Sequence, residues 1–327
     1  MASMRAIRIQ GFGGPEVLKV SSVERPTPKP GQVLVQIKSA GVNPVDTYIR
    51  AGTFGPRPFP LGLGGDAAGI VAAVADGEKN IKVGDRVFTC EGPGPLTGTY
   101  AEYALVPTRA VFPLPDSLTF SQGAALGIPY LTALRSLIIK AKSKPHETLL
   151  VHGASGAVGL AACQVASSWG MKVFGTAGTD DGLQLIKANG AGAVFNHRDK
   201  NYVQKLREAV GEHGFDVILE MVANHNLGVD VELAAVDGRI VVIGSHGEAK
   251  FEPFHMMGKE VTVAGVMLPH STDEEWRIIG AELVKGINSG HVRPVIDQEF
   301  PLEKAPEAHE AVIQHTGGSK GKIVLTL

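Results

Sequence analysis

The order of apolar and polar positions changes twice along this chain of 327 residues. The first third consists of short alternating runs separated by glycine and proline. In Gln32–Ser39, for example, Val33, Val35 and Ile37 alternate with polar neighbours. A period of two is typical of half-buried strands, and a series of such strands with Gly/Pro turns predicts a small barrel or sandwich.

From about residue 124, strand patterns alternate with helical ones. Thr148–His152 is predicted as a buried strand, Ala157–Ser168 as a helix and Lys172–Thr176 as the next strand. This alternation predicts a parallel sheet with helices on both faces. After residue 265 the pattern returns to helices and a terminal strand, Lys322–Leu327.

We therefore predict an α/β protein in which residues 124–265 form a doubly wound parallel-sheet domain. This domain is inserted between residues 1–123 and 266–327, which together form a second, mostly β domain. The length of the chain agrees with two domains.

Composition restricts the function classes. With 44% hydrophobic and 20% charged residues and a net charge of -2, the chain is typical of a soluble protein, and no overall field favours nucleic acid or membrane. The two cysteines, Cys90 and Cys163, are too few for a disulfide framework or a four-cysteine zinc site. Neither a signal-peptide pattern nor a transmembrane stretch is found, so we expect a cytoplasmic protein.

A glycine-rich turn, Gly153–Gly159, follows the first strand of the predicted parallel sheet and opens a helix. Measured against the pattern G-x-G-x-x-G, its three positions are held by Ala154, Gly156 and Gly159. Small residues let the backbone approach a pyrophosphate, whose charge the helix N-terminus stabilises. The helix, Ala157–Ser168, carries no charge and must be buried, so the context favours a dinucleotide site over a purely structural turn.

The second strand indicates which nicotinamide cofactor is bound. An NAD site expects an acidic residue about 20 positions beyond the middle glycine, but Lys172–Gly178 contains none, which favours NADPH. Asp180 and Asp181 follow closely and oppose this interpretation. The expected positive partners of a 2′-phosphate are His197 and Arg198, after the third strand.

Several segments resemble the medium-chain dehydrogenase/reductase superfamily, and the last two of them narrow the resemblance to zeta-crystallin and the related quinone oxidoreductases. These segments are Gly13–Leu18, Gly41–Arg50, Gly84–Phe88, Tyr100–Tyr103, Val151–Gly156 and Phe195–Arg198. The resemblance implies a GroES-like catalytic domain that holds an inserted Rossmann domain. It also implies NADPH-dependent reduction of quinones, by one electron to the semiquinone, in a homodimer or homotetramer.

The same resemblance implies an enzyme without catalytic zinc. In zinc-dependent relatives a cysteine and a histidine bind the metal, and their positions fall here at Asn43 and Gly65. Neither Cys90 nor Cys163 replaces them, so the three converging ligands that a catalytic zinc needs are not expected.

By resemblance, residue for residue, Tyr48 and Asn43 are the catalytic candidates. The expected contacts of NADPH are Tyr48, Ser155, Gly156, Ala157, Val158, Gly178, His197, Asn226, Ile243, Gly244, Ser245, His246, Val266, Met267 and Leu268. His246 departs from the family pattern, in which we expect arginine. A neutral imidazole attracts a phosphate less than a guanidinium does.

Two other functions remain open at this point. Reduction of enones or alkenals keeps the fold and the cofactor and changes only the acceptor. The resemblance also allows a crystallin-like structural role or binding of AU-rich RNA, for which the basic run Lys140–Lys144 lacks the aromatic residues that stack on bases. For the oligomer, Glu260–Leu268 is the expected edge of the parallel sheet.

Overall fold

The computed structural model describes residues 2–90, 97–314 and 317–327, and these divide into two compact units. The first unit comprises Met1–Ile128, Pro294–Thr316 and Lys322–Leu327, and the second comprises Pro129–Arg293 and Gly317–Gly321. The sequence pattern places the two changes near residues 124 and 265. Among the described residues, no helix is both long and apolar enough to cross a membrane.

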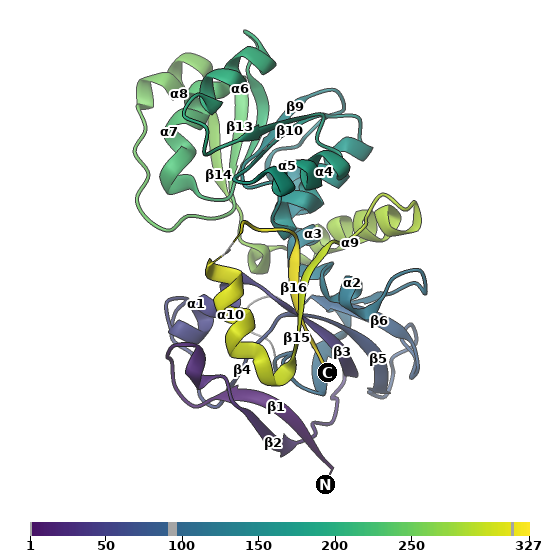
Figure 1. Cartoon of the computed structure of the whole chain (residues 1–327). Helices are drawn as coiled ribbons and strands as arrows, with labels where there is room; N and C mark the ends of the chain where they lie inside the picture. Colours follow the sequence, from purple (N-terminus) through teal and green to yellow (C-terminus); the bar gives the residue numbers. More distant parts are fainter. Residues whose placement is uncertain (1, 91–96, 315–316) are drawn as a thin grey trace. The chain divides into compact units, whose positions relative to one another are not determined.

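The first unit is built on a seven-stranded sheet, in the order β15-β16-β3-β5-β6-β8 with β7 also pairing β3, and a three-stranded sheet, β2-β1-β4 (Figure 1). Its strands are β1 (Ser3–Ile9), β2 (Val20–Glu24), β3 (Gln32–Val42), β4 (Leu61–Gly62), β5 (Asp66–Val74), β6 (Arg86–Cys90), β7 (Tyr103–Pro107), β8 (Val111–Pro113), β15 (Ile296–Pro301) and β16 (Lys322–Thr326). Its helices are α1 (Pro44–Ala51), α2 (Phe120–Ala124) and α10 (Ala305–Gln314).

The longest strand of this unit, β3, lies between elements from distant parts of the sequence. It pairs antiparallel with β5 and also with β16, in a register that places Gly41 opposite Val324. Val33, Val35 and Ile37 of β3 are buried in the core, as predicted, but Leu34 on the opposite face of the strand is buried as well. The last strand of the chain thus completes the sheet that the first hundred residues begin.

The second unit contains one parallel sheet in the order β11-β10-β9-β12-β13-β14. Its strands are β9 (Thr148–Val151), β10 (Lys172–Ala177), β11 (Ala193–Asn196), β12 (Phe215–Glu220), β13 (Ala234–Val242) and β14 (Thr262–Gly265). Its helices are α4 (Ala157–Ser168), α5 (Asp180–Ala188), α6 (Tyr202–Val210), α7 (Ala223–Leu233), α8 (Pro253–Lys259) and α9 (Asp273–Asn288). In order along the chain this is the 3-2-1-4-5-6 arrangement of a Rossmann fold.

Helices cover both faces of this parallel sheet, with α4 and α5 on one side and α6, α7 and α8 on the other (Figure 1). The uncharged helix α4 is buried along most of its length, as its composition predicts. Because all six strands are parallel, their carboxyl ends lie at one edge, and the strand order reverses between β9 and β12. Ligands of such folds bind outside this edge at the reversal.

The Leu/Ile spacing of Ala124–Lys140 predicts a helix over this region, and this prediction is wrong in detail. The structure divides this region into α2, the helix α3 (Gly127–Leu134) and a π-helical segment, Arg135–Lys140. Pro129 lacks an N–H group, so it is accommodated in the first turn of a new helix rather than inside a continuous one. The chain enters the second unit within α3.

Candidate functional site

In the second unit the residues predicted to bind the cofactor all follow the carboxyl ends of the parallel strands. Ser155–Val158 follow β9, Gly178 follows β10 and His197 follows β11. On the other half of the sheet, Asn226 lies in α7 after β12, while Ile243–His246 follow β13 and Val266–Leu268 follow β14. The structure therefore brings these residues to one edge of one sheet, and their contact with a dinucleotide remains a prediction.

The glycine-rich turn after β9 has the conformation and the close packing that its sequence requires. Gly153 has a positive φ of 58°, which favours glycine, and the N–H of Ala154 donates to the carbonyl of Thr176 at 2.8 Å. A Cβ at Gly159 would lie 2.5 Å from Cα of Ala154, so only glycine allows α4 to approach the turn. Among the described residues, no side chain caps the N-terminus of α4 at Gly156, and a helix N-terminus suits an anion.

At the end of β10, glycine leaves space for two basic side chains. A Cβ at Gly178 would lie 2.7 Å from Nε2 of His197 and 3.0 Å from Nε of Arg198. Burial, followed by neighbouring cationic groups, lowers the pKa of His197, so this imidazole is mainly neutral near pH 7. The guanidinium of Arg198 is then the permanent positive charge beside Gly178.

Sequence reasoning missed Lys320 in this region. Lys320 belongs to Gly317–Gly321, which is part of the second unit, and its ammonium group forms an ion pair of 2.7 Å with Asp181. Lys320 therefore offsets the negative charge of Asp181, one of the two acidic residues that argue against an NADPH site. The two partners are 139 residues apart in the sequence, and no local pattern predicts their contact.

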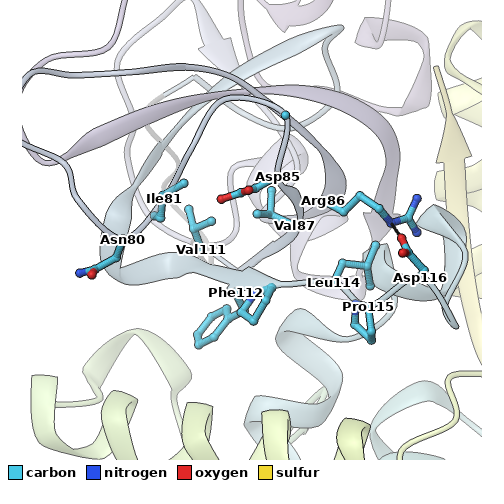
Figure 2. A pocket seen from close by; sticks show the side chains of 12 residues that line it. Asn80, Ile81, Asp85, Arg86, Val87, Val111, Phe112, Leu114, Pro115 and Asp116 are labelled. Atoms are coloured by element: carbon cyan, nitrogen blue, oxygen red, sulfur yellow. Dashed lines mark ion pairs between the residues drawn. The ribbon is translucent and has the colours of Figure 1, made fainter.

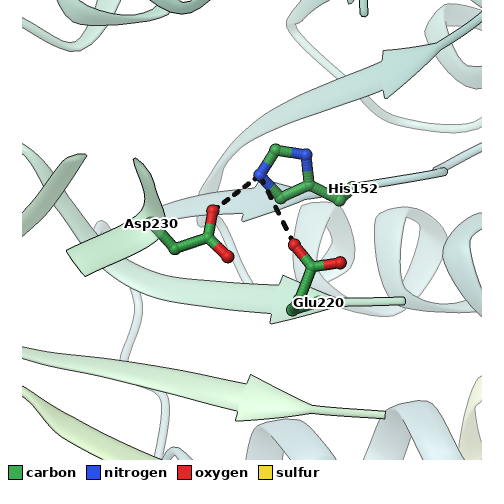
Figure 3. A group of neighbouring side chains, drawn as sticks. All are labelled: His152, Glu220 and Asp230. Atoms are coloured by element: carbon green, nitrogen blue, oxygen red, sulfur yellow. Dashed lines mark hydrogen bonds and ion pairs between the residues drawn. The ribbon is translucent and has the colours of Figure 1, made fainter. Parts of the chain in front are cut away.

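A buried group of ionisable side chains, which the sequence reasoning also missed, lies beneath this edge: His152, Glu220 and Asp230 (Figure 3). His152 Nε2 is 2.9 Å from Asp230 Oδ1 and 3.9 Å from Glu220 Oε2. One ligand atom from each of the three lies within 4.8 Å of the others, so the group could hold a metal ion. Its local signal is a histidine directly before the glycine turn.

Protons, in place of a metal ion, can also neutralise the negative charges of this group. Glu220 Oε2 and Asp230 Oδ2 have no hydrogen-bond partner among the described residues, and one proton shared between carboxyl groups would satisfy both. Burial raises the pKa of Glu220. Burial lowers the pKa of His152, but the Asp230 and Glu220 carboxylates outweigh this effect and the net shift is upward. A protonated His152 that donates to the Asp230 carboxylate therefore accounts for the short contact between these two side chains.

The buried group connects three of the predicted cofactor segments. His152 directly precedes the glycine turn, and Glu220 Oε1 accepts a hydrogen bond of 3.3 Å from Asn226 Nδ2. The backbone carbonyl of Glu220 accepts from the N–H of Ile243 at 2.8 Å. These contacts fix the relative positions of the loops after β9, β12 and β13.

A shallow cavity of about 530 Å³ lies beside the last two loops of the edge. Its lining includes two predicted cofactor segments, Ile243–Ser245 and Val266–Met267. Arg135 also lines it and holds the loop after β14, because its guanidinium donates to the carbonyls of Met267 at 3.1 Å and His270 at 3.3 Å. Arg135 in turn pairs with Glu275 at 2.9 Å.

In the first unit, the two predicted catalytic residues lie at the start of α1. Asn43 follows β3 and precedes the helix, and its backbone N–H donates to Asp46 Oδ2 at 2.8 Å. Tyr48 lies one turn into the helix and is half-buried. Burial raises the pKa of Tyr48, so the phenol stays neutral and can donate a hydrogen bond.

The side chain of Asn43 is held from two sides. Its Nδ2 donates to Asp66 Oδ2 at 2.9 Å, and its Oδ1 accepts from the ammonium group of Lys322. Lys322 also pairs with Asp66 Oδ2 at 3.3 Å. Asn43, Asp66 and Lys322 are each at most 3% exposed, so this ion pair is shielded from solvent.

A second buried chain of hydrogen bonds reaches the same helix. Nη1 of Arg50 is 3.2 Å from Nδ1 of His309, and Nε2 of His309 is 3.0 Å from the hydroxyl of Tyr100, which donates to Asp46 Oδ2 at 3.3 Å. Because arginine only donates, Nδ1 must accept and Nε2 must carry the proton. Burial, with Arg50 beside it, lowers the pKa of His309 to about 3, and burial raises the pKa of Asp46 to about 7.

The residues at the two positions of a catalytic zinc do not fit that metal. Asn43 and Gly65 supply no thiolate and no imidazole. The ammonium of Lys322 contacts Asn43 and also Asp66, the neighbour of Gly65, so a cation is already present among these side chains. A zinc ion there would face a positive charge without its preferred ligands.

A second cavity, of about 560 Å³, lies elsewhere on the first unit. It is formed mainly by the turn after β5 and by β6 and β8, and Arg86 and Asp116 form an ion pair of 3.1 Å at one end (Figure 2). The guanidinium of Arg86 also lies over the ring of Phe120 at 4.3 Å. None of the predicted site residues is part of its lining.

Comparison with known families matches both parts of the chain. Residues 29–116 match the family described as "Alcohol dehydrogenase GroES-like domain", and residues 157–285 match "Zinc-binding dehydrogenase". Among solved structures, the Escherichia coli quinone oxidoreductase complexed with NADPH superposes with a TM-score of 0.87 at 31% identity, over all of both chains. A mycobacterial protein complexed with NADPH has a TM-score of 0.89 at 30% identity, over 99% of this chain and 100% of that one.

Curated relatives match over the whole length. The quinone oxidoreductase of Homo sapiens is 49% identical, over 99% of this chain and 98% of its own. Quinone oxidoreductase 1 of Escherichia coli is 33% identical, over 93% of this chain and 94% of its own. The resemblance noted in the sequence is thus confirmed along with the fold, and the chain belongs to the zeta-crystallin and quinone oxidoreductase family of the medium-chain dehydrogenase/reductase superfamily.

Proposed function

We propose that this protein is an NADPH-dependent quinone reductase. The observation that carries the proposal is the full-length likeness to quinone oxidoreductases at 49% identity. The edge of the parallel sheet supports it, because a glycine-rich turn opens an uncapped helix there and Arg198 lies beside Gly178, where an NAD site would have a carboxylate.

The pyrophosphate of the cofactor would rest on Ser155–Val158, at the N-terminus of α4. The adenosine 2′-phosphate would lie against Gly178, His197 and Arg198. The segments after β12, β13 and β14 would hold the remainder. When bound, NADPH supplies a hydride equivalent, so that either one quinone gains two electrons or two quinones gain one each while a proton is released.

On the acceptor side, Asn43 and Tyr48 would orient the quinone. Both present neutral hydrogen-bond donors, an amide and a protonated phenol, and quinone oxygens are hydrogen-bond acceptors. The oxygens become more negative as electrons arrive, so donors held in place stabilise the reduced acceptor more than the oxidised one. Tyr48 would also contact the nicotinamide.

The proposal includes activity without zinc, since the donor set at Asn43 and Gly65 does not suit the metal. In the described residues β14 is an edge strand of the parallel sheet (Figure 1). The proposal also includes a homodimer or homotetramer in which this strand pairs between subunits. The buried cysteines Cys90 and Cys163 are not joined in a disulfide, which agrees with the reducing cytoplasm as the location of the protein.

The test is oxidation of NADPH, with NADH in parallel, against 9,10-phenanthrenequinone and an alkenal in the presence of a metal chelator. We expect turnover of the quinone with NADPH, weaker turnover with NADH, and no effect of the chelator. Electron paramagnetic resonance of the product distinguishes one-electron reduction from two-electron reduction. Turnover of the alkenal alone, to a saturated aldehyde, would contradict the proposal.

The alternative functions receive less support. Enone or alkenal reduction shares the fold and the cofactor, but the relatives named above are quinone oxidoreductases. The basic run Lys140–Lys144 ends a helix and has no interleaved aromatic residue, so RNA binding lacks a stacking surface there.

A further inference from the structure

The ion pair between Lys322 and Asp66 is unusual because it is almost fully shielded from water. The side chain of Lys322 is 3% exposed and that of Asp66 is 0% exposed. Removing two charges from water costs more free energy than a simple pair returns, unless further hydrogen bonds satisfy both partners. Here they do so: Asp66 Oδ1 accepts from the N–H of Ile128 at 2.8 Å, and Asp66 Oδ2 and Lys322 both bind the side chain of Asn43.

The backbone around the pair is shaped to hold it. A Cβ at Gly41 would lie 2.9 Å from Cε of Lys322 and 3.0 Å from Cβ of Asp66. A Cβ at Gly127 would lie 2.2 Å from Oδ1 of Asp66. Two glycines on different elements therefore leave the space that the lysine and the carboxylate occupy.

These contacts determine the orientation of the Asn43 amide. An ammonium group only donates hydrogen bonds and a carboxylate only accepts them. Oδ1 of Asn43 must therefore face Lys322, and Nδ2 must face Asp66. The two atoms of an asparagine amide are easily exchanged by a rotation, but here the exchange would place the N–H groups against an ammonium and Oδ1 against a carboxylate. Nδ2 carries two N–H groups, and the bond to Asp66 uses one of them.

We propose that Lys322 is a positioning residue of the acceptor site: its ammonium group, paired with Asp66, fixes the Asn43 amide so that one N–H is presented to the quinone oxygen. The proposal rests on the proposed function, which makes Asn43 a contact of the acceptor. Lys322 acts through Asn43, and its positive charge supplements that amide at the position where zinc-dependent relatives use a metal ion.

The first variant to measure is Lys322→Met, which keeps the length of the side chain and removes the charge. We expect kcat/KM for 9,10-phenanthrenequinone to fall by about 10- to 100-fold, whereas the Kd of NADPH changes by less than about twofold. Lys38→Met, on the neighbouring strand β3, is the control and should leave both values unchanged. Wild-type kcat/KM in Lys322→Met would overturn the proposal.

Removing Lys322 alone leaves the Asp66 carboxylate buried without its partner and can unfold the unit. The double variant Asp66→Asn with Lys322→Met neutralises both partners and should regain most of the lost thermal stability. We expect its quinone activity to stay low, because the Asn43 amide is still not fixed. Recovery of activity together with stability would mean that Lys322 has only a structural role.

A double-mutant cycle identifies the route of the effect. We expect Lys322→Met to change kcat/KM by less than about twofold when Asn43→Ala is already present, since the amide through which it acts is gone. The same 10- to 100-fold loss in both backgrounds would contradict the proposed route.

One measurement does not depend on turnover. The side-chain amide signals of Asn43, assigned in a ¹⁵N nuclear magnetic resonance spectrum by their loss in Asn43→Asp, should be protected from hydrogen exchange in the wild type and exchange at least about tenfold faster in Lys322→Met. Unchanged protection would overturn the proposal. Wild-type protein that shows this protection but does not reduce quinones would contradict the proposed function and leave the role of Lys322 intact.

Discussion

At the scale of single residues, glycines determine how closely neighbouring side chains can pack at the proposed sites. Gly178 leaves His197 and Arg198 room to lie over the end of β10, where the 2′-phosphate is expected. We predict that Gly178→Ala raises the KM for NADPH by about tenfold and that for NADH much less, because the methyl group displaces the basic side chains. Steady-state kinetics with both cofactors tests this. Gly258→Ala, which has open space around it, is the matched control.

His246 departs from the family pattern, and this departure can be tested by a substitution that should strengthen NADPH binding. His246 is exposed after β13, and an imidazole attracts a phosphate less than the guanidinium of the arginine expected from the resemblance. We predict that His246→Arg lowers the Kd of NADPH by about three- to tenfold at low salt and that of NADH less. A fluorescence titration at two salt concentrations measures both. An equal gain for the two cofactors would show that the 2′-phosphate is not involved.

At the scale of elements, the loop after β14 depends on a side chain from the π-helical segment. Arg135 binds two carbonyls of this loop and pairs with Glu275 of α9. We predict that Arg135→Met lowers the free energy of unfolding by about 2–3 kcal/mol and weakens NADPH binding, since the loop that includes Met267 loses its support. Thermal denaturation and titration with NADPH measure the two effects.

The control for this variant is on α9, the helix that carries the partner of Arg135, Glu275. Arg277→Met removes an exposed ion pair with Glu274 on α9 and should change stability by less than about 0.5 kcal/mol. Full NADPH affinity in Arg135→Met, despite lower stability, would mean that the loop after β14 does not contact the cofactor.

The elements also indicate what a sequence can predict. The strand, turn and helix around Gly153–Gly159 are recognisable because the signal is local: an apolar run, small residues and an uncharged helix. The region of Ala124–Lys140 was harder to predict because its apolar spacing is helical throughout while Pro129 starts a new helix. For the buried group, only the histidine before the glycine turn is visible in the local sequence. The contacts of His152 and the ion pair of Lys320 could not be predicted, because their partners meet only after the sheet is formed.

At the scale of the whole molecule, one hydrogen-bond chain contains two buried titratable groups, Asp46 and His309. Their titrations change the stability of the folded state in opposite directions. Burial raises the pKa of Asp46 to about 7, so the folded state holds this proton more tightly and loses stability as pH rises from about 4 to about 7. Burial lowers the pKa of His309 to about 3, so the folded state loses stability as pH falls from about 6.5 to about 3. Where the two ranges overlap, the effects cancel.

We predict that removing either titratable group reveals the pH dependence of stability that the other group causes. Asp46→Asn should make the melting temperature rise by several degrees relative to the wild type between pH 4 and 7, because only the titration of His309 then changes stability. His309→Gln should make it fall by a similar amount over the same range. Differential scanning calorimetry at four pH values checks this, and parallel curves for all three proteins would refute it.

The contact between Lys322 and Asn43 spans 279 positions of the sequence. During synthesis, Asn43 leaves the ribosome long before β16 does, and the parallel sheet between them is complete earlier than the sheet that contains β3. Closing so long a loop is slow compared with forming local contacts. The nascent protein can therefore acquire a formed dinucleotide fold while Asp66 still lacks its lysine, and the maturation of activity should follow the docking of β16 as the last step.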